Sequence, residues 1–247
     1  MTHTADKWSE IEHLPQWDEE FYHVYTAKKF GKWVMLKTLK PQYRDIPEFR
    51  EMIEKEFEVR YNLAHPHIVM INDYEEVPGL GMCIITDDVY GRSLRQIIDE
   101  GKITDRHVSQ LRHQLVSAME YILSNHIVHH PIRPETIIFT DKIENLKLID
   151  VGYDQKRSLS TMTVDDDIRN YGLILREVIE KGHISDAHLC AVADRCLDPN
   201  PARRFHSVTD LHLALENTNN SRIYIFVISF MAIMIAVLIA LQISKIG

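Results

Sequence analysis

Apolar residues recur at helical spacing over residues 105–124, in the middle of the chain. The repeated positions are Val108, Leu111, Leu115, Met119 and Ile122. Because they are separated by three or four residues, they fall on one face of a helix and predict a buried stripe. Thr104 precedes the stripe and is a typical residue for capping the first turn. The pattern therefore predicts a helix over this whole range.

Other periodic segments indicate further helices. They are expected over residues 46–63, from Ser93 onward, over 189–197 and over 208–215. For the first of these, we expect Asp45 to be the N-cap and Pro47 to lie in the first turn.

Short apolar runs bounded by polar or glycine-containing turns predict strands. Two strands are expected within residues 15–40 and two more within residues 70–86. Residues 137–139 and 146–149 predict a hairpin with a polar turn. Residues 1–14 show no comparable pattern and are expected to form a loose lead-in.

The C-terminal part contains an uncharged apolar run from 223 to 243. About 20 apolar residues cross the hydrocarbon core of a bilayer, which is about 30 Å thick. A buried helix is the alternative, but this run is apolar on all faces, which a small domain could not cover. We therefore expect a transmembrane helix in contact with lipid, after a linker at 217–222 and before a short tail at 244–247. A single span in this position predicts a tail anchor on a membrane, with the folded part in the cytoplasm.

The 247 residues carry a formal net charge of −8 and include three cysteines. The acidic balance and the lack of a long basic run argue against a nucleic-acid partner. Sparse cysteines without metal-like spacing indicate reduced thiols. The cluster of His126, His129 and His130 lacks a carboxylate or thiolate at a usable spacing, so no structural metal is expected.

Two motifs flank the predicted hairpin: HHPIRPET at 129–136 and DVG at 150–152. In frame and spacing they resemble the H-R-D-L-x-x-x-N catalytic loop and the D-F-G motif of the protein kinase family. Other matches follow in the family's order: VMLK at 34–37, LAHPHIV at 63–69, DDIRNYG at 166–172 and LDPNPARRF at 197–205. The resemblance covers about residues 17–215.

This resemblance implies an α+β, two-lobed protein-kinase-like fold over residues 15–216. The small lobe would span 15–86, the hinge 87–91 and the large lobe 92–216. The hinge backbone near Asp87 and Val89 would meet the adenine of a bound nucleotide.

The resemblance also implies phosphate-binding and metal-binding residues. Lys37 stands at the position of the phosphate-pairing lysine, and Glu56 stands at the position of its partner. The alternative for Glu56 is a surface glutamate with Arg60 four residues on. Asp150 would hold Mg²⁺ beside ATP. Binding of ATP and Mg²⁺ is expected to be weak or absent, because other residues of the family's nucleotide site and catalytic loop are missing, as described next.

Two chemical residues of the catalytic loop are missing. Pro131 stands at the position of the catalytic aspartate, and Thr136 stands at that of the metal-binding asparagine. Proline has no polar side chain and no backbone N–H, so it cannot accept a proton from a substrate hydroxyl. A positioned general base contributes roughly 10²–10⁴-fold to a rate.

The phosphate-covering loop of the family is also altered. Aligning Val24 with the valine of G-x-G-x-x-G-x-V places Trp17, Glu19 and Tyr22 at the three glycine positions. None of these lets the backbone close on a phosphate as glycine does, and Glu19 would repel it. The segment after Gly152 is short and has no A-P-E motif, which leaves the family's partner of Arg204 absent.

Three functions are compatible with these residues. The first is a pseudokinase, a kinase-like domain without phosphotransfer, acting as a membrane-tethered binding, scaffold or regulatory module for a protein partner in signalling. The second is an active atypical Ser/Thr kinase that uses Lys37, Glu56 and Asp150 with another base such as Asp154. The third is lateral association through the apolar tail, where Ala232 and Ala236 are four residues apart. The missing groups favour the first.

Overall fold

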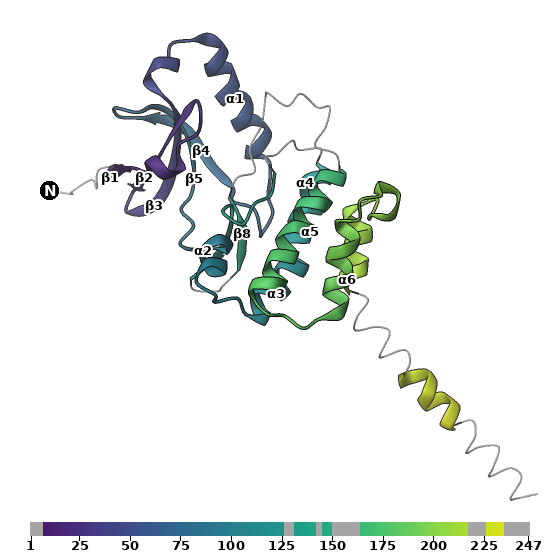
Figure 1. Cartoon of the computed structure of the whole chain (residues 1–247). Coiled ribbons are helices and arrows are strands. Elements are labelled where there is room, and N and C mark those ends of the chain that lie inside the picture. Colours follow the sequence, from purple (N-terminus) through teal and green to yellow (C-terminus); the bar gives the residue numbers. More distant parts are fainter. Residues whose placement is uncertain (1–6, 126–130, 142–144, 150–163, 217–225, 235–247) are drawn as a thin grey trace, which may run out of the picture.

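The computed structural model describes residues 7–125, 131–141, 145–149, 164–216 and 226–234, most of which form two lobes (Figure 1). The first lobe contains β1 (Trp8–His13), η1 (Pro15–Trp17), β2 (Tyr22–Lys29), β3 (Lys32–Leu39), η2 (Pro41–Tyr43), α1 (Pro47–Tyr61), β4 (Ile71–Val77) and β5 (Gly81–Asp87). The second contains β6 (Gly91–Ser93), α2 (Leu94–Asp99), α3 (Asp105–Gln110), the π-helical turn η3 (Leu111–Leu115), α4 (Val116–Ser124), β7 (Ile137–Thr140), β8 (Leu146–Leu148), α5 (Val164–Lys181), α6 (Ala187–Cys196), η4 (Pro201–Arg203) and a helix at 208–216.

The first lobe is built on a five-stranded antiparallel sheet in the order β1-β2-β3-β5-β4. Phe30 and Gly31 join β2 to β3 with φ values of 50° and 82°. These positive values are those of a two-residue type I′ turn, whose twist matches the flanking strands. The strands expected within residues 15–40 and 70–86 are thereby confirmed.

Side chains of β3 alternate between the two faces of this sheet. Val34 and Leu36 are buried in an apolar cluster on one face. Leu39 lies in the cluster on the other face, together with Ile53 of α1. Because side chains two apart along a strand share a face, Lys37 points to the side of the sheet that α1 covers.

The expectation of a loose lead-in at residues 1–14 is wrong for its second half. Residues Trp8–His13 form β1, which pairs with β2 at the edge of the sheet. Its four central side chains are exposed, so the strand carries no alternating apolar pattern. A register irregularity between Ser9 and Glu12 interrupts the pairing further. The folded domain therefore begins before residue 15.

The helix expected over residues 46–63 is α1, which runs from Pro47 to Tyr61 with Pro47 in its first turn as expected, but Asp45 does not cap it. The N-cap is Ile46, without a side-chain hydrogen bond. The Asp45 carboxylate instead accepts a hydrogen bond from Arg50 at 2.9 Å.

The helix predicted over residues 105–124 is confirmed as the continuous segment α3, η3 and α4. Thr104 caps its start reciprocally with His107, since each side chain accepts a hydrogen bond from the other residue's backbone N–H. All five residues of the predicted stripe are buried in the large-lobe core. Gly172 of α5 allows α6 to approach closely, because a Cβ atom there would lie 2.5 Å from the Cβ of Cys196.

The predicted hairpin is β7 and β8, which join β6 in a small sheet. Asp87 ends β5, and β6 starts at Gly91, so the predicted hinge at 87–91 connects the two lobes. The α+β, two-lobed arrangement expected from the resemblance is confirmed.

The expected transmembrane run at 223–243 is described only at residues 226–234. These residues form a helix (Figure 1). All of their side chains are exposed. Among the described segments of the chain, no helix combines the length and apolarity needed to cross a membrane. Asp150, Asp154 and the segment up to residue 163 lie outside the described residues.

Candidate functional site

A cleft of about 670 Å³ is lined by residues of both lobes. The sheet contributes Val24 and Lys37, and the catalytic-loop segment contributes Thr136. The two residues predicted at the hinge, Asp87 and Val89, also line it. Four of the sequence-predicted residues, Lys37, Asp87, Val89 and Thr136, therefore line one cavity, whereas Glu56 and Pro131 are not among its lining residues.

Lys37 forms the ion pair that the sequence predicted with Glu56 of α1. The Lys37 Nζ lies 3.1 Å from the Glu56 Oε1, and the Glu56 side chain is only 2% exposed. The same oxygen accepts a hydrogen bond from Arg60 at 2.7 Å. Glu56 therefore has both of the partners considered from the sequence, but in a buried site instead of on the surface.

Burial and charge act in opposite directions on this pair. Burial alone would lower the pKa of Lys37, but the carboxylates of Glu56 and Glu19 outweigh it and hold that pKa above its ordinary value. Burial would likewise raise the pKa of Glu56, but Lys37 and Arg60 keep it below its ordinary value. Both groups are therefore charged at neutral pH.

Glu19 occupies the position facing Lys37 that the resemblance assigns to a nucleotide phosphate. Its Oε1 lies 2.8 Å from the Lys37 Nζ, and its Oε2 lies 2.9 Å away. Tyr22 completes this surrounding, since the Lys37 ammonium lies 4.2 Å from the centre of its ring. Two of the three residues at the predicted glycine positions, Glu19 and Tyr22, thus contact Lys37. Glycines at these positions would leave the lysine open to phosphate.

The sequence predicted that Glu19 would repel phosphate, but it missed the ion pair with Lys37. A carboxylate in place of glycine beside a cationic lysine was the signal that could have indicated it. Lys37 already holds two carboxylates, so the described side chains do not fit a triphosphate in this arrangement.

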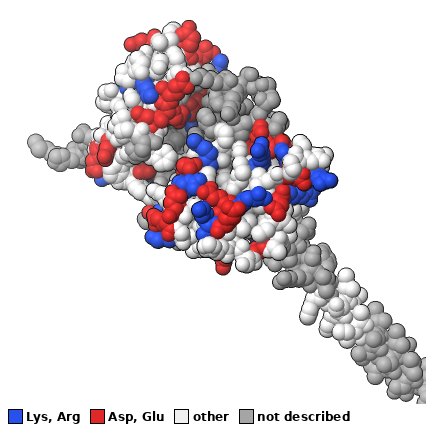
Figure 2. Space-filling model, in the orientation of Figure 1, with Lys and Arg blue, Asp and Glu red and all other residues white. Residues whose placement is uncertain are grey.

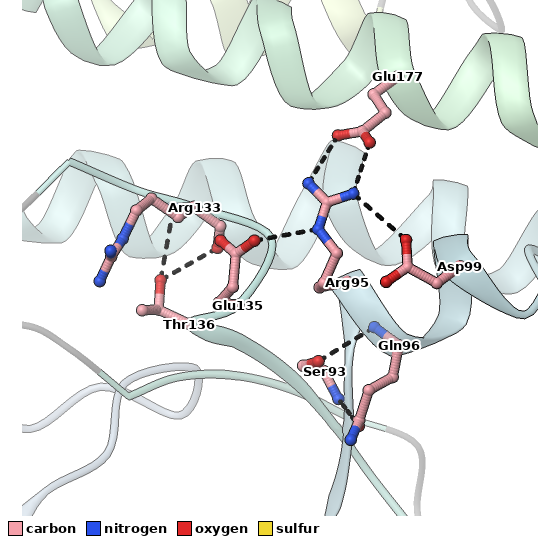
Figure 3. A network of polar contacts seen from close by, with 8 residues as sticks. All are labelled: Ser93, Arg95, Gln96, Asp99, Arg133, Glu135, Thr136 and Glu177. Atoms are coloured by element: carbon pink, nitrogen blue, oxygen red, sulfur yellow. Dashed lines mark hydrogen bonds and ion pairs between the residues drawn. The ribbon is translucent and has the colours of Figure 1, made fainter. Parts of the chain in front are cut away.

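Thr136 is buried and its hydroxyl is engaged by its own loop. Its Oγ1 donates to the Arg133 carbonyl at 3.1 Å and accepts from the Arg133 backbone N–H at 3.4 Å (Figure 3). The position expected for a metal-binding amide therefore holds a hydroxyl used to close the turn. Pro131, at the position of the catalytic aspartate, is half-buried.

A buttress that the sequence did not reveal holds the catalytic-loop frame on the large lobe. Arg95 of α2 donates to Glu135 at 3.0 Å and binds both carboxylate oxygens of Glu177 on α5, at 2.6 and 3.1 Å (Figure 3). The hydrogen bonds that Arg95 donates to the carboxylates of Glu177 and Glu135 raise its pKa. Its partners lie 40 and 82 residues away, so no local pattern indicated them.

Arg204, which the resemblance left without a partner, is paired within the large lobe. Its Nη1 lies 2.6 Å from the Asp165 Oδ2, and its Nε donates to the Asp198 carbonyl at 2.7 Å. An acid at the start of α5 therefore takes the place of the missing A-P-E glutamate.

Charged side chains of both signs are interleaved on the face drawn in Figure 2. Lys and Arg alternate with Asp and Glu across the large lobe, and this face has no continuous basic strip among the described residues. The distribution agrees with the net charge of −8.

Comparison with known proteins agrees with this architecture. The protein kinase domain family matches residues 20–188, more than half of the chain. Serine/threonine-protein kinase 36 of Pongo abelii is 32% identical over 146 residues, which are 58% of this chain and 11% of that protein. Serine/threonine-protein kinase PknD of Mycobacterium tuberculosis is 32% identical over 120 residues, which are 47% of this chain and 18% of that protein. The chain thus spans less than a fifth of the length of these two relatives.

Among solved structures, the PknI kinase domain of Mycobacterium tuberculosis superposes with a TM-score of 0.60 at 21% identity. The superposition covers 85% of this chain and 95% of that domain, and it shows the fold. The chain belongs to the protein kinase domain family.

Proposed function

We propose that this chain is a pseudokinase: a membrane-tethered binding or regulatory module that does not transfer phosphate. The observation that carries the proposal is the ion pair between Glu19 and Lys37 in the cleft. A nucleotide phosphate and the Glu19 carboxylate are both anions, so they compete for the same ammonium group. Nucleotide binding is consequently weak or absent.

The catalytic loop supports the same conclusion. Its frame is held in place by Arg95 and Glu135, yet it presents Pro131 where a proton acceptor is needed. Phosphoryl transfer depends on positioning and charge stabilisation, and on a group that orients the attacking hydroxyl. A catalytic-loop segment that keeps its conformation but lacks these groups can serve as a binding surface for a protein partner.

Activity is tested by incubating the full chain with radiolabelled ATP and Mg²⁺ and comparing it with the Asp150→Ala variant. We expect no labelling of the chain or of a general protein substrate above the level of the variant. Labelling that disappears in Asp150→Ala would establish the alternative, an active Ser/Thr kinase with an unusual base. The names of the curated relatives, which are Ser/Thr kinases, make this the natural alternative.

Membrane tethering through residues 223–243 is supported by the composition of that segment. The described part is helical and exposes Phe226, Phe230 and Met231, which a water-facing helix would not favour. Contact with lipid would cover them, and the lobes would face the cytoplasm.

Extraction of cell membranes with alkaline carbonate tests the tether. The wild type should stay with the membrane, whereas the double variant Met231→Arg and Met234→Arg should be released. Each arginine at the centre of a span costs about 2.5–3.5 kcal/mol on insertion scales. The matched variant with leucine at both positions should behave as the wild type, and release of the wild type itself would contradict the tether.

A further inference from the structure

Two histidines and an aspartate converge where β1, the following turn and β2 meet. The His13 Nε2 lies 3.0 Å from the Asp18 Oδ1, and the His23 Nδ1 lies 2.7 Å from the Asp18 Oδ2. The two imidazole rings are 4.7 Å apart and nearly perpendicular, at 81°. One possible ligand atom from each residue lies within 4.8 Å of the other two. The residues come from three successive backbone elements, so the fold and not local spacing assembles them.

The surroundings orient each of these side chains. The Val24 backbone N–H donates to the Asp18 Oδ1 at 3.0 Å, which fixes the carboxylate plane. Tyr25 packs against the His13 ring with centroids 4.8 Å apart. Burial would raise the pKa of Asp18, but the hydrogen bonds from Val24, His23 and His13 outweigh it and keep the pKa below its ordinary value. The carboxylate is therefore ionised and held between two imidazole nitrogens.

Two imidazoles and one carboxylate are a ligand set typical of zinc sites that retain an open coordination position. Zinc binds such atoms at about 2.0–2.2 Å, so neighbouring ligands around one ion lie roughly 3 to 3.5 Å apart. A single carboxylate oxygen, the Asp18 Oδ2, lies 3.1 Å from the His13 Nε2 and 2.7 Å from the His23 Nδ1, so both of these separations are close to this range. The three side chains are 36%, 19% and 24% exposed in chain order, so an ion can enter from solvent.

We propose that His13, Asp18 and His23 bind one Zn²⁺ ion. The expectation that the chain holds no structural metal rested on the cluster at His126, His129 and His130 and did not consider this set. The bound ion ties β1 to β2 across the turn that carries Glu19, the residue next to Asp18 in sequence. Zinc therefore stabilises the conformation in which Glu19 faces Lys37.

A second group of possible metal ligands is a weaker candidate for a zinc site. His113, His212 and Glu216 also come within 4.8 Å of one another. His212 already contacts Glu120 at 3.0 Å, and the Glu216 side chain is 52% exposed. This group supplies a control, because histidines scattered over a chain give background zinc binding.

The test uses the full chain purified in detergent, freed of metal by a chelator and titrated with Zn²⁺ near neutral pH. A chromophoric chelator as competitor reports the affinity of each variant. We expect about one high-affinity ion per chain in the wild type, and an affinity at least about tenfold lower in His13→Gln, His23→Gln and Asp18→Asn. The control His212→Gln should bind as the wild type does. Mg²⁺ should not compete, because it prefers oxygen ligands.

The His13→Gln variant separates a metal site from a network of hydrogen bonds. Glutamine keeps an N–H donor for Asp18 but is a poor zinc ligand, whereas His13→Cys supplies a good one and should retain binding. Because His13 lies in the edge strand β1, these two variants decide the matter even if His23→Gln fails to fold. Titration with Co²⁺ should give the visible bands of a tetrahedral ion in the wild type and in His13→Cys. Equal zinc affinity in wild type and His13→Gln would overturn the proposal.

Discussion

Glu19 and Lys37 are ion-paired in the cleft, with the Glu19 Oε1 2.8 Å from the Lys37 Nζ. Glu19 comes from the turn between η1 and β2, where the protein kinase family has a glycine-rich loop, and Lys37 comes from β3. The chain thus supplies its own anion to the lysine that the family uses for phosphate. The positive charge of Lys37 is thereby balanced by side chains of the chain itself, Glu19 and Glu56.

The buried carboxylate of Glu56 is expected to contribute strongly to stability. Replacing it in Glu56→Gln leaves the buried Arg60 guanidinium without its anion, and removing one partner of a buried pair costs about 3–5 kcal/mol. Urea denaturation should show a loss of at least about 2 kcal/mol, because Lys37 keeps Glu19 as a partner. The control is Glu51→Gln in the same helix, where the side chain is 66% exposed beside Lys55. That variant should have nearly the same stability as the wild type, and equal losses in both would contradict the buried pair.

Replacing Arg95 by lysine is expected to lower the stability of the chain. A lysine ammonium cannot bind Glu177 with two parallel hydrogen bonds while it also reaches Glu135. We expect Arg95→Lys to lose about 1–2 kcal/mol of unfolding free energy, measured by urea denaturation. Arg176→Lys, at an exposed pair with Asp194, is the control and should lie within about 0.5 kcal/mol of the wild type. An unfolding free energy of Arg95→Lys equal to that of the wild type would show that these contacts of Arg95 do not hold the loop.

Two neighbouring histidines predict a loss of stability in mild acid. Burial lowers the pKa of His65 and of His67, so the unfolded chain binds more protons than the folded chain below the ordinary histidine pKa of about 6.5. Stability is therefore fully present above that value and falls as the pH drops through the lowered pKa values.

Denaturation midpoints at about pH 7.5 and about pH 5.5 check this dependence. His65 uses its Nδ1 to accept the backbone N–H of His67 at 3.2 Å, and an asparagine oxygen can do the same without titrating. The double variant His65→Asn and His67→Asn should lose less stability over this range than the wild type. An unchanged pH dependence would assign the loss to other groups.

The sequence predicted those parts of the fold that motifs or apolar periodicity mark. The stripe from Val108 to Ile122 and the pairing of Lys37 with Glu56 are examples, because repeated spacing or a flanking motif located each of them. Strand β1 escaped detection, since an exposed edge strand needs no alternating apolar residues.

Contacts between polar residues distant in sequence were the other gap. The links from Arg95 to Glu177 and from Arg204 to Asp165 depend on how α5 is placed in the large lobe. The contact between Glu19 and Lys37 was missed for a related reason, because the sequence shows the charge of Glu19 but not where its side chain points. The partners of long polar side chains depend on which residues the folded backbone places near them.

Nucleotide binding by the wild type and by Glu19→Gln tests the central claim most directly. The readout is the melting temperature of the full chain with increasing ATP and Mg²⁺, where a ligand at 100 times its Kd stabilises a fold by about 2.7 kcal/mol. Glu20→Gln, an exposed neighbour with the same change of charge, is the control, and Lys37→Met added to Glu19→Gln removes the phosphate partner. We predict little or no shift for the wild type and Glu20→Gln, a saturable shift for Glu19→Gln, and its loss in the double variant. A wild type that shifts as far as Glu19→Gln, at the same ATP concentrations, would contradict the account.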